Sequence, residues 1–140
     1  MSRMSRENIL WIASTFHAGQ TYGCEPYVNH LMRVADHAER LAPFYHVDPE
    51  YTWAVGMLHD LFEDTDASYL DIKGRVLIEV IKEMVHLDKT VYSSYSEYIR
   101  SVGQYPLARA VKIADLIDNL GHKPRKNNIQ KYLDALKELL

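Results

Sequence analysis

The stretch WAVGMLHDLFEDTD, residues 53–66, changes from apolar to acidic at its midpoint. Its first six residues predict a buried segment, whereas the remainder contains one histidine and four acids. If the stretch forms a single helix as far as residue 64, His59 lies one turn from Glu63. Asp60 then lies one turn from Asp64 in the same way. Carboxylates at a helix C-terminus face the negative end of the helix dipole and repel one another, so the pattern indicates a bound cation.

Each of these side chains also has a purely structural interpretation. Asp66 lies where a following helix begins, and we interpret it as the N-cap of that helix, with Asp64 as a second candidate. The remaining acids would then be solvated. His59 and Asp60 follow the apolar run directly, and for them we favour a pair of metal ligands.

The composition of the chain is typical of one globular domain, which we expect to cover residues 1–140. The net charge of −3 provides no electrostatic footprint for DNA or RNA. Cys24 is the only cysteine, so no internal disulfide can form, and this favours a cytoplasmic location. The N-terminal apolar stretch is short and interrupted, which predicts neither a signal peptide nor a membrane span.

Apolar residues recur at helical spacing along most of the chain, and alternation typical of strands is weak. We predict an all-α domain of about seven helices, with the glycine-containing stretch HAGQTYGCE, residues 17–25, as a loop. Proline and Asp residues provide several of the start signals. The predicted helices begin near residue 5 or 8, at Pro26, at Asp48, at Arg75, within residues 88–104, at Pro106 and at Ile129.

A metal site needs more ligands, and two other positions can supply them. Asp115 interrupts the apolar face of ARAVKIADLIDNL, residues 108–120, and burying it is costly unless it is paired or binds a metal. Lys112 lies one turn earlier and offers a salt bridge as the structural alternative, while Asn119 lies one turn later on the same face. His30 lies near the start of the second predicted helix.

His30, His59, Asp60 and Asp115 together form a mixed imidazole and carboxylate set. This set contains too much oxygen for a typical structural zinc site and suits Mn²⁺, Fe²⁺ or Mg²⁺ with open positions for water. We assign no metal role to the other histidines, His17, His37, His46, His86 and His122.

The order His30, His59-Asp60 and Asp115 resembles the H…HD…D signature of the HD phosphohydrolase superfamily. The similarity extends to three motifs of the RelA/SpoT-type (p)ppGpp hydrolase domain, including its small stand-alone relatives. These motifs are HAGQTYGCEPYVNH, LHDLFEDT and VKIADLIDNL, and with their spacing they cover the chain from about Ile9 to Leu120.

The resemblance implies an HD-type helical bundle that holds Mn²⁺ and hydrolyses ppGpp to GDP and pyrophosphate. In that family the Glu-Asp pair serves the nucleophilic water, which points to Glu63 and Asp64. The family's Asn after the last ligand lines the nucleotide site, which points to Asn119. Such an alarmone hydrolase acts in the stringent response on a small nucleotide, with no nucleic-acid or membrane partner. The candidate cations for its phosphates are Lys112, Lys89 and Arg33.

The sequence departs from the family pattern after the Gly-Gln pair, where relatives carry basic residues and an Arg packs on the guanine. Here the loop reads Thr21-Tyr22-Gly23-Cys24 and is one residue shorter. Tyr22 is a candidate to stack on the base without adding charge, with packing inside the loop as the alternative. The family's Pro after the first metal His is Leu31 here. Phosphohydrolysis is therefore better supported than guanine specificity.

Three other functions stay open. The chain fits another HD hydrolase, for example a deoxynucleotide 5′-phosphatase or a nucleotide pyrophosphohydrolase. It also fits a non-catalytic nucleotide-sensing module, although the intact set of ligands and acids argues against this. A helical scaffold without a site would require the charged cluster to be accidental.

Overall fold

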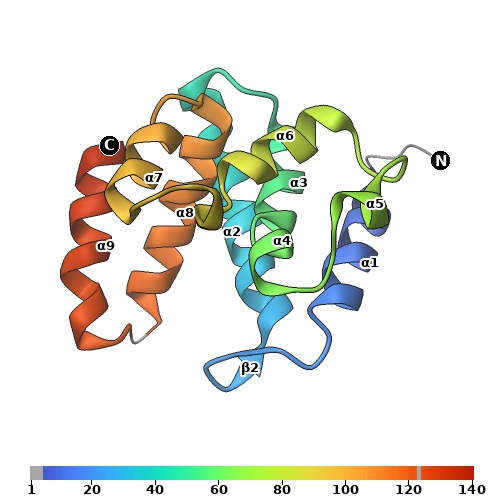
Figure 1. Cartoon of the computed structure of the whole chain (residues 1–140), viewed down its shortest axis with the longest axis horizontal. Coiled ribbons are helices and arrows are strands. Elements are labelled where there is room, and N and C mark those ends of the chain that lie inside the picture. Colours follow the sequence, from blue (N-terminus) through green and yellow to red (C-terminus); the bar gives the residue numbers. More distant parts are fainter. Residues whose placement is uncertain (1–4, 123) are drawn as a thin grey trace.

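The computed structural model describes residues 5–122 and 124–140. The prediction that the N-terminal stretch is neither a signal peptide nor a membrane span therefore lies partly outside the described residues. These residues form the predicted all-α architecture, and seven of the helices have eight or more residues. The α-helices (Figure 1) are α1 Arg6–Phe16, α2 Tyr27–Leu41, α3 Pro49–Leu58, α4 Leu61–Asp64, α5 Tyr69–Ile72, α6 Ile78–His86, α7 Tyr95–Val102, α8 Pro106–Gly121 and α9 Lys126–Leu139. Two 3₁₀ helices, Ala42–Tyr45 and Lys89–Val91, complete the helical elements.

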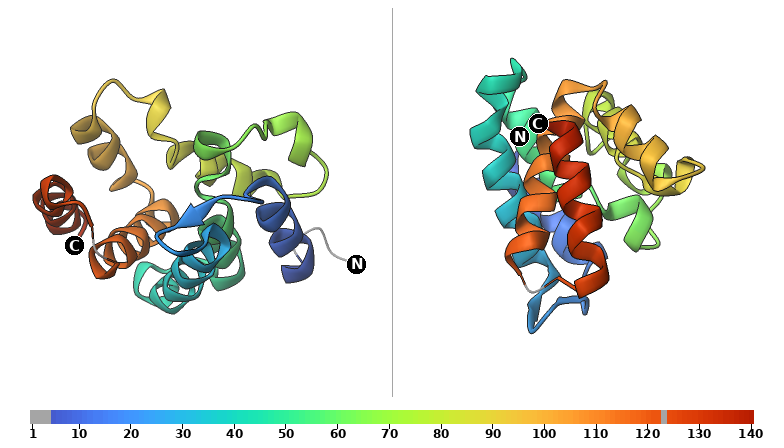
Figure 2. Two further views of the ribbon diagram at one scale, coloured as in Figure 1. Left: turned by 90° about the horizontal axis from the view of Figure 1, so that it is seen from below. Right: turned by 90° about the vertical axis from the view of Figure 1, so that its left-hand side faces the viewer.

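Helices α2, α3 and α8 form the centre of the molecule. Helix α2 packs against both α3 and α8, α1 covers α3, and α9 covers the outer side of α8 (Figures 1 and 2). The fully buried aliphatic side chains come mainly from the inner faces of these helices, as the helical periodicity predicts. No helix in the part of the chain that the structure describes is long and apolar enough to cross a membrane.

The contact between α2 and α3 is unusually close at Gly56. A Cβ atom on Gly56 would lie 2.6 Å from the Cα of Ala35, which real Cβ atoms do not approach. Glycine at residue 56 and alanine at residue 35 therefore allow the two backbones to meet. This contact sets the spacing between α2, which carries His30, and α3, which His59 directly follows.

Several helix ends follow the start signals in the sequence. Asp48 caps α3, accepting a hydrogen bond from the backbone N–H of Tyr51, and Pro49 occupies the first turn. Pro106 opens α8, as predicted. Asp66 does not cap the next helix, so that interpretation is wrong. Ser68 caps α5 instead, in a capping box in which Asp71 accepts the N–H of Ser68.

The predicted loop at residues 17–25 contains a short hairpin. Strand β1, Thr21–Tyr22, pairs antiparallel with β2, Glu25–Pro26, and the connection takes a positive φ of 62° at Gly23. Pro26 therefore lies just before α2 rather than in its first turn. The fourth predicted helix starts at Ile78 instead of Arg75, because residues 73–76 form a turn with a β-bridge.

The single helix expected over residues 53–64 is wrong. Helix α3 ends at Leu58, and α4 begins at Leu61 after a two-residue turn. His59 Nδ1 lies 2.6 Å from the carbonyl oxygen of Gly56, the oxygen that would accept the N–H of Asp60 in a continuous helix. The His59 side chain therefore takes over a main-chain acceptor, and the chain turns where the acidic residues begin.

Candidate metal centre

The four predicted ligand side chains converge from three parts of the chain. His30 comes from the first turns of α2, His59 and Asp60 from the turn between α3 and α4, and Asp115 from the middle of α8. Asp115 Oδ1 lies 3.1 Å from Nε2 of His30 and 3.3 Å from Nε2 of His59. Asp60 Oδ2 lies 3.2 Å from Nε2 of His59 and 3.9 Å from Nε2 of His30.

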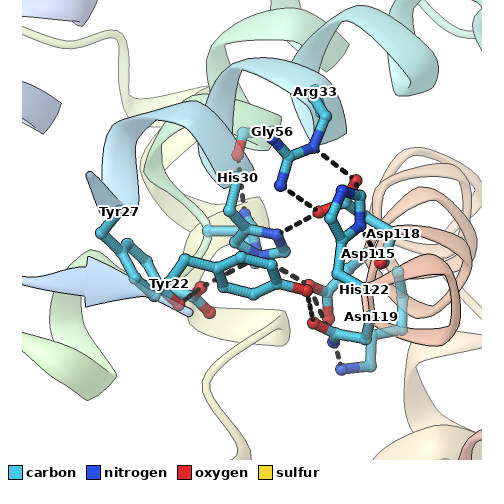
Figure 3. A network of polar contacts seen from close by, with 12 residues as sticks. Tyr22, Tyr27, His30, Arg33, Gly56, Asp115, Asp118, Asn119 and His122 are labelled. Atoms are coloured by element: carbon cyan, nitrogen blue, oxygen red, sulfur yellow. Dashed lines mark hydrogen bonds and ion pairs between the residues drawn. The ribbon is translucent and has the colours of Figure 1, made fainter. Parts of the chain in front are cut away.

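The orientation of both imidazoles fits metal ligation. Each ring uses Nδ1 on a fixed acceptor and turns Nε2 toward the carboxylates. His59 Nδ1 bonds the Gly56 carbonyl. His30 Nδ1 bonds Asp118, as Figure 3 shows. One ligand atom from each of His30, His59 and Asp60 lies within 4.8 Å of the others. Two imidazole nitrogens and two carboxylates form a donor set that suits a divalent cation with open positions.

Electrostatics at the cluster favour charged side chains despite their burial. Burial favours the neutral acid, but Lys112 and the two imidazoles hold the pKa of Asp115 well below its ordinary value. Burial likewise opposes protonation of His59, yet Asp60 and Asp115 raise the pKa of His59 well above its ordinary value. Positive charge is therefore favoured where the imidazoles face the carboxylates, which is where a bound cation would lie.

The salt bridge that the sequence offered for Asp115 is present, and its geometry leaves the proposed metal ligation open to it as well. Its Oδ1 atom faces the two imidazoles, and its Oδ2 atom accepts a hydrogen bond of 2.9 Å from Lys112 Nζ. Asn119 lies one turn later, with Nδ2 3.4 Å from Asp115 Oδ1. Both predicted neighbours of Asp115 on α8 are thus in contact with it.

Glu63 and Asp64 lie on α4, beside Asp60. Carboxylate oxygens of these three acids come within 4.8 Å of one another. Glu63 accepts a hydrogen bond of 3.1 Å from the backbone N–H of Lys89 and pairs with its Nζ at 3.4 Å. Burial, together with Asp60 and Glu63, raises the pKa of Asp64 to about 6. Asp64 is therefore more basic than an ordinary aspartate.

Sequence reasoning missed Tyr27, the first residue of α2. Its hydroxyl donates to Asp60 Oδ2 at 2.5 Å and reaches Asp64 Oδ2 at 3.5 Å. The ring stacks on His17, with centroids 5.0 Å apart. A tyrosine at the N-terminus of a helix carries no chemical signal in the sequence, because its partners come from a different segment.

A cavity of about 230 Å³ opens over the cluster. Its lining includes the acids Glu63 and Asp64. It also includes lysines from three separate segments, Lys89, Lys112 and Lys131, together with Tyr95. The hydroxyl of Tyr95 is buried without a hydrogen-bond partner among the described residues. Lys131 and Tyr95 had no role in the sequence analysis.

A larger cavity of about 670 Å³ adjoins the first, because Asn119 and Tyr132 line both. Its wall comes from the hairpin, the end of α8 and the first turns of α9, including Tyr22, Arg125 and Asn128. The two cavities together form a site with the His/Asp cluster at one end.

Tyr22 lines the larger cavity and lies against His30, which lines the smaller one (Figure 3). Its ring stacks on His30, with centroids 4.3 Å apart and an interplanar angle of 8°, and its hydroxyl donates to Asn119 Oδ1 at 2.7 Å. One face of the ring is therefore already covered by His30, while the residue also lines the larger cavity. Both roles considered for Tyr22 remain compatible with this position.

The fold and the site together define a class of protein: a helical domain with a buried His/Asp cluster. Residues 27–120 match the HD domain family, and the chain belongs to this family. Among curated proteins, it is 30% identical over 104 residues to guanosine-3′,5′-bis(diphosphate) 3′-pyrophosphohydrolase of Aquifex aeolicus (strain VF5). That match covers 69% of this chain and 14% of the relative, so the chain corresponds to a small part of that protein.

Among solved structures, the chain is similar to one described as a metazoan ortholog of SpoT that hydrolyses ppGpp and plays a role in starvation responses. The TM-score is 0.74 at 22% identity, covering 99% of this chain and 84% of the other. The HD-type helical fold is thereby confirmed. The resemblance to RelA/SpoT-type hydrolase domains that the three motifs indicate is likewise confirmed.

Proposed function

We propose that the protein is a metal-dependent nucleotide phosphohydrolase, and that its substrate is ppGpp, hydrolysed at the 3′-diphosphate to GDP and pyrophosphate. The observation that carries this proposal is the convergence of the imidazole nitrogens of His30 and His59 with Asp60 and Asp115 at the floor of a lysine-bearing cavity. We further propose that residues 1–140 act as one domain, in the cytoplasm, as an alarmone hydrolase of the stringent response.

In this proposal His30, His59, Asp60 and Asp115 hold Mn²⁺, with Fe²⁺ or Mg²⁺ as alternatives. A divalent cation there would make water more acidic and neutralise charge on the phosphate. Asp64 accepts a proton from the attacking water, a role supported by its raised pKa of about 6. Glu63, held by Lys89, orients that water.

The three lysines that line the smaller cavity support a substrate with several phosphate charges. Burial, together with the nearby Lys89 and Lys112, lowers the pKa of Lys131, so three ammonium groups share a small volume. Lys89 and Lys112 already pair with Glu63 and Asp115, and a further anion near Lys131 would relieve the remaining repulsion among the three lysines. In this proposal the diphosphate group that is cleaved from ppGpp lies beside the His/Asp cluster and supplies such an anion.

The larger cavity supports a nucleoside next to the phosphates. Asn119 borders both cavities, which supports a contact with the sugar or base, and Tyr22 and Tyr132 offer aromatic surface in its wall. Arg125 is a cation in the same wall. In this proposal the nucleoside lies between the hairpin and the start of α9.

A second candidate, hydrolysis of another nucleotide, is favoured by the hairpin. Residues 21–25 contain no Lys or Arg that could contact a guanine base. The residue of this segment that stacks on His30 is the uncharged Tyr22. Recognition of guanine therefore has less support than hydrolysis of a phosphate ester.

The test is a panel of ppGpp, pppGpp, deoxynucleoside monophosphates and triphosphates with Mn²⁺. Phosphate and pyrophosphate are measured separately, and Asp60→Asn serves as the control for contaminating activity. Pyrophosphate released from ppGpp supports the first candidate. Phosphate from a deoxynucleotide supports the second, and nucleotide binding without any product would identify a sensing module.

A further inference from the structure

The two imidazoles of the cluster are held by partners of different kinds. Nδ1 of His59 bonds a main-chain oxygen, the carbonyl of Gly56, at 2.6 Å. Nδ1 of His30 bonds a side chain, Oδ2 of Asp118, also at 2.6 Å (Figure 3). A carbonyl is neutral and belongs to the backbone, whereas a carboxylate is charged and can be replaced. Among the described residues, only His30 of the two has its Nδ1 bonded to a side chain outside the four predicted ligands.

Asp118 is itself firmly placed. Its side chain is 8% exposed and lies on α8, one turn after Asp115. Nε and Nη2 of Arg33 reach its two oxygens at 2.8 and 3.2 Å, a bidentate arrangement. Arg33 in turn pairs with Glu25 of the hairpin at 2.7 Å. A continuous chain of contacts thus runs from the wall of the larger cavity to His30.

We propose that Asp118 is a positioning residue for the metal centre, fixing His30 with its proton on Nδ1 and its Nε2 lone pair toward the metal. This inference rests on the metal centre of the proposed function. A carboxylate behind a ligating imidazole sets the tautomer and ring orientation and makes the ligand more basic. Arg33 contributes by fixing the plane of the Asp118 carboxylate through both of its oxygens.

A purely structural role is the competing explanation, because the Arg33–Asp118 pair also joins α2 to α8. The two roles predict different results. A structural clamp stabilises the folded chain with or without metal and leaves the affinity for metal unchanged. A positioning residue changes the dissociation constant for Mn²⁺ in chains that remain folded.

The experiment measures the Kd for Mn²⁺ from the electron paramagnetic resonance signal of the free ion. It compares the parent, Asp118→Asn and Asp118→Ala, each shown by circular dichroism to be folded in the presence of chelator. Asp134→Asn on α9 is the matched control, since it removes an exposed carboxylate that bonds only Gln130 among the described residues. Arg33→Gln tests the support of Asp118.

We expect Asp118→Ala to raise the Kd by about 10- to 100-fold, the usual effect of losing such a partner. Asp118→Asn keeps an acceptor oxygen and should lie between Asp118→Ala and the parent. Arg33→Gln should have a smaller effect that disappears in the Asp118→Ala background, and Asp134→Asn should match the parent. Values for both Asp118 variants within twofold of the parent would overturn the positioning role alone. Absence of Mn²⁺ uptake by the parent would overturn the metal centre itself.

A second measurement decides the matter if the Asp118 variants do not fold. In the parent loaded with diamagnetic Zn²⁺, nitrogen-15 NMR reports which ring nitrogen of His30 carries the proton. A proton on Nδ1 with a strongly downfield shift supports the inference. A proton on Nε2 overturns it.

Discussion

The two ends of the site are built in different ways. Ligand side chains at the metal end come from α2, α8 and the α3–α4 turn, and His30, His59 and Asp115 are at most 5% exposed. The wall of the larger cavity comes from the hairpin and the start of α9, where residues 23, 24, 125 and 128 are exposed or partly exposed. In the proposed function, one end fixes the chemistry, whereas the other sets which nucleotide enters.

The largest effect is expected at the metal end. Asp60→Ala removes one of the four proposed ligands, so uptake of about one Mn²⁺ per chain and all metal-dependent turnover should be lost. Elemental analysis after Mn²⁺ soaking and dialysis measures the metal content, and the nucleotide panel measures the turnover. Asp66→Ala, which removes an exposed acid six residues later, is the control. Normal metal content in Asp60→Ala would contradict the assignment.

Substitutions of the two acids on α4 should lower catalysis without removing the bound metal. Glu63→Gln and Asp64→Asn should keep the metal and the fold, yet lower turnover by about 100-fold or more, the scale for losing a general base. Rate measurements at saturating substrate, with metal content determined on the same samples, test this. Parent rates in both variants would show that neither acid serves the water.

The rigid support of the metal end predicts an effect on stability. Gly56→Ala places a Cβ atom 2.6 Å from the Ala35 backbone, so α2 and α3 must move apart. We expect the free energy of unfolding to fall by about 1–3 kcal/mol, as for other overpacked cores. Gly121→Ala is the matched control, because its Cβ meets nothing within 4 Å. Urea denaturation of the chelated proteins measures both, and equal stability would show that the contact yields without cost.

The smallest effect is expected in the larger cavity, at the end of the site away from the proposed metal ligands. Tyr22→Ala should raise KM for guanine and adenine versions of one substrate alike, with little change in kcat. Stacking on a base contributes about 1–3 kcal/mol. Because His30 already covers one face of the ring, we expect about 1 kcal/mol, or about fivefold in KM.

Tyr22→Phe is the companion variant, since it keeps the ring and removes only the hydroxyl that bonds Asn119. Its KM should lie between those of the parent and Tyr22→Ala. An unchanged KM in Tyr22→Ala would remove this residue from the substrate site. A loss confined to guanine would instead show that the ring takes part in specific recognition.

The cluster of candidate ligands could be predicted because their chemistry conflicts with their surroundings. Asp115 interrupts an apolar helix face, and His59-Asp60 ends an apolar run, so each needs a charged partner. The break after α3 could not be predicted in the same way. Residues 53–64 contain no proline, and Gly56 is their only glycine, so the sequence offers little sign that the helix ends there. The turn includes a contact between the His59 side chain and the main-chain oxygen of Gly56, which the sequence does not reveal.

The N-cap of α5 was within reach of the sequence, since Ser68 and Asp71 have the spacing of a capping box. Asp118 was less accessible. It lies on the same helix as Asp115 and Asn119, but its role depends on His30, 88 residues away in the chain. Long-range pairs of this kind leave no local pattern, and the hairpin contact through Arg33 is hidden for the same reason.

The distribution of the ligand positions along the chain, from residue 30 to residue 115, has a thermodynamic consequence. The proposed ion finds its complete site only after α2, the α3–α4 turn and α8 have docked, so it binds the folded chain in preference to the unfolded one. At 100 times the Kd, such binding raises the free energy of unfolding by about 2.7 kcal/mol. Metal supply would then govern the survival of this protein against proteolysis as well as its turnover, and chelation would shorten its lifetime.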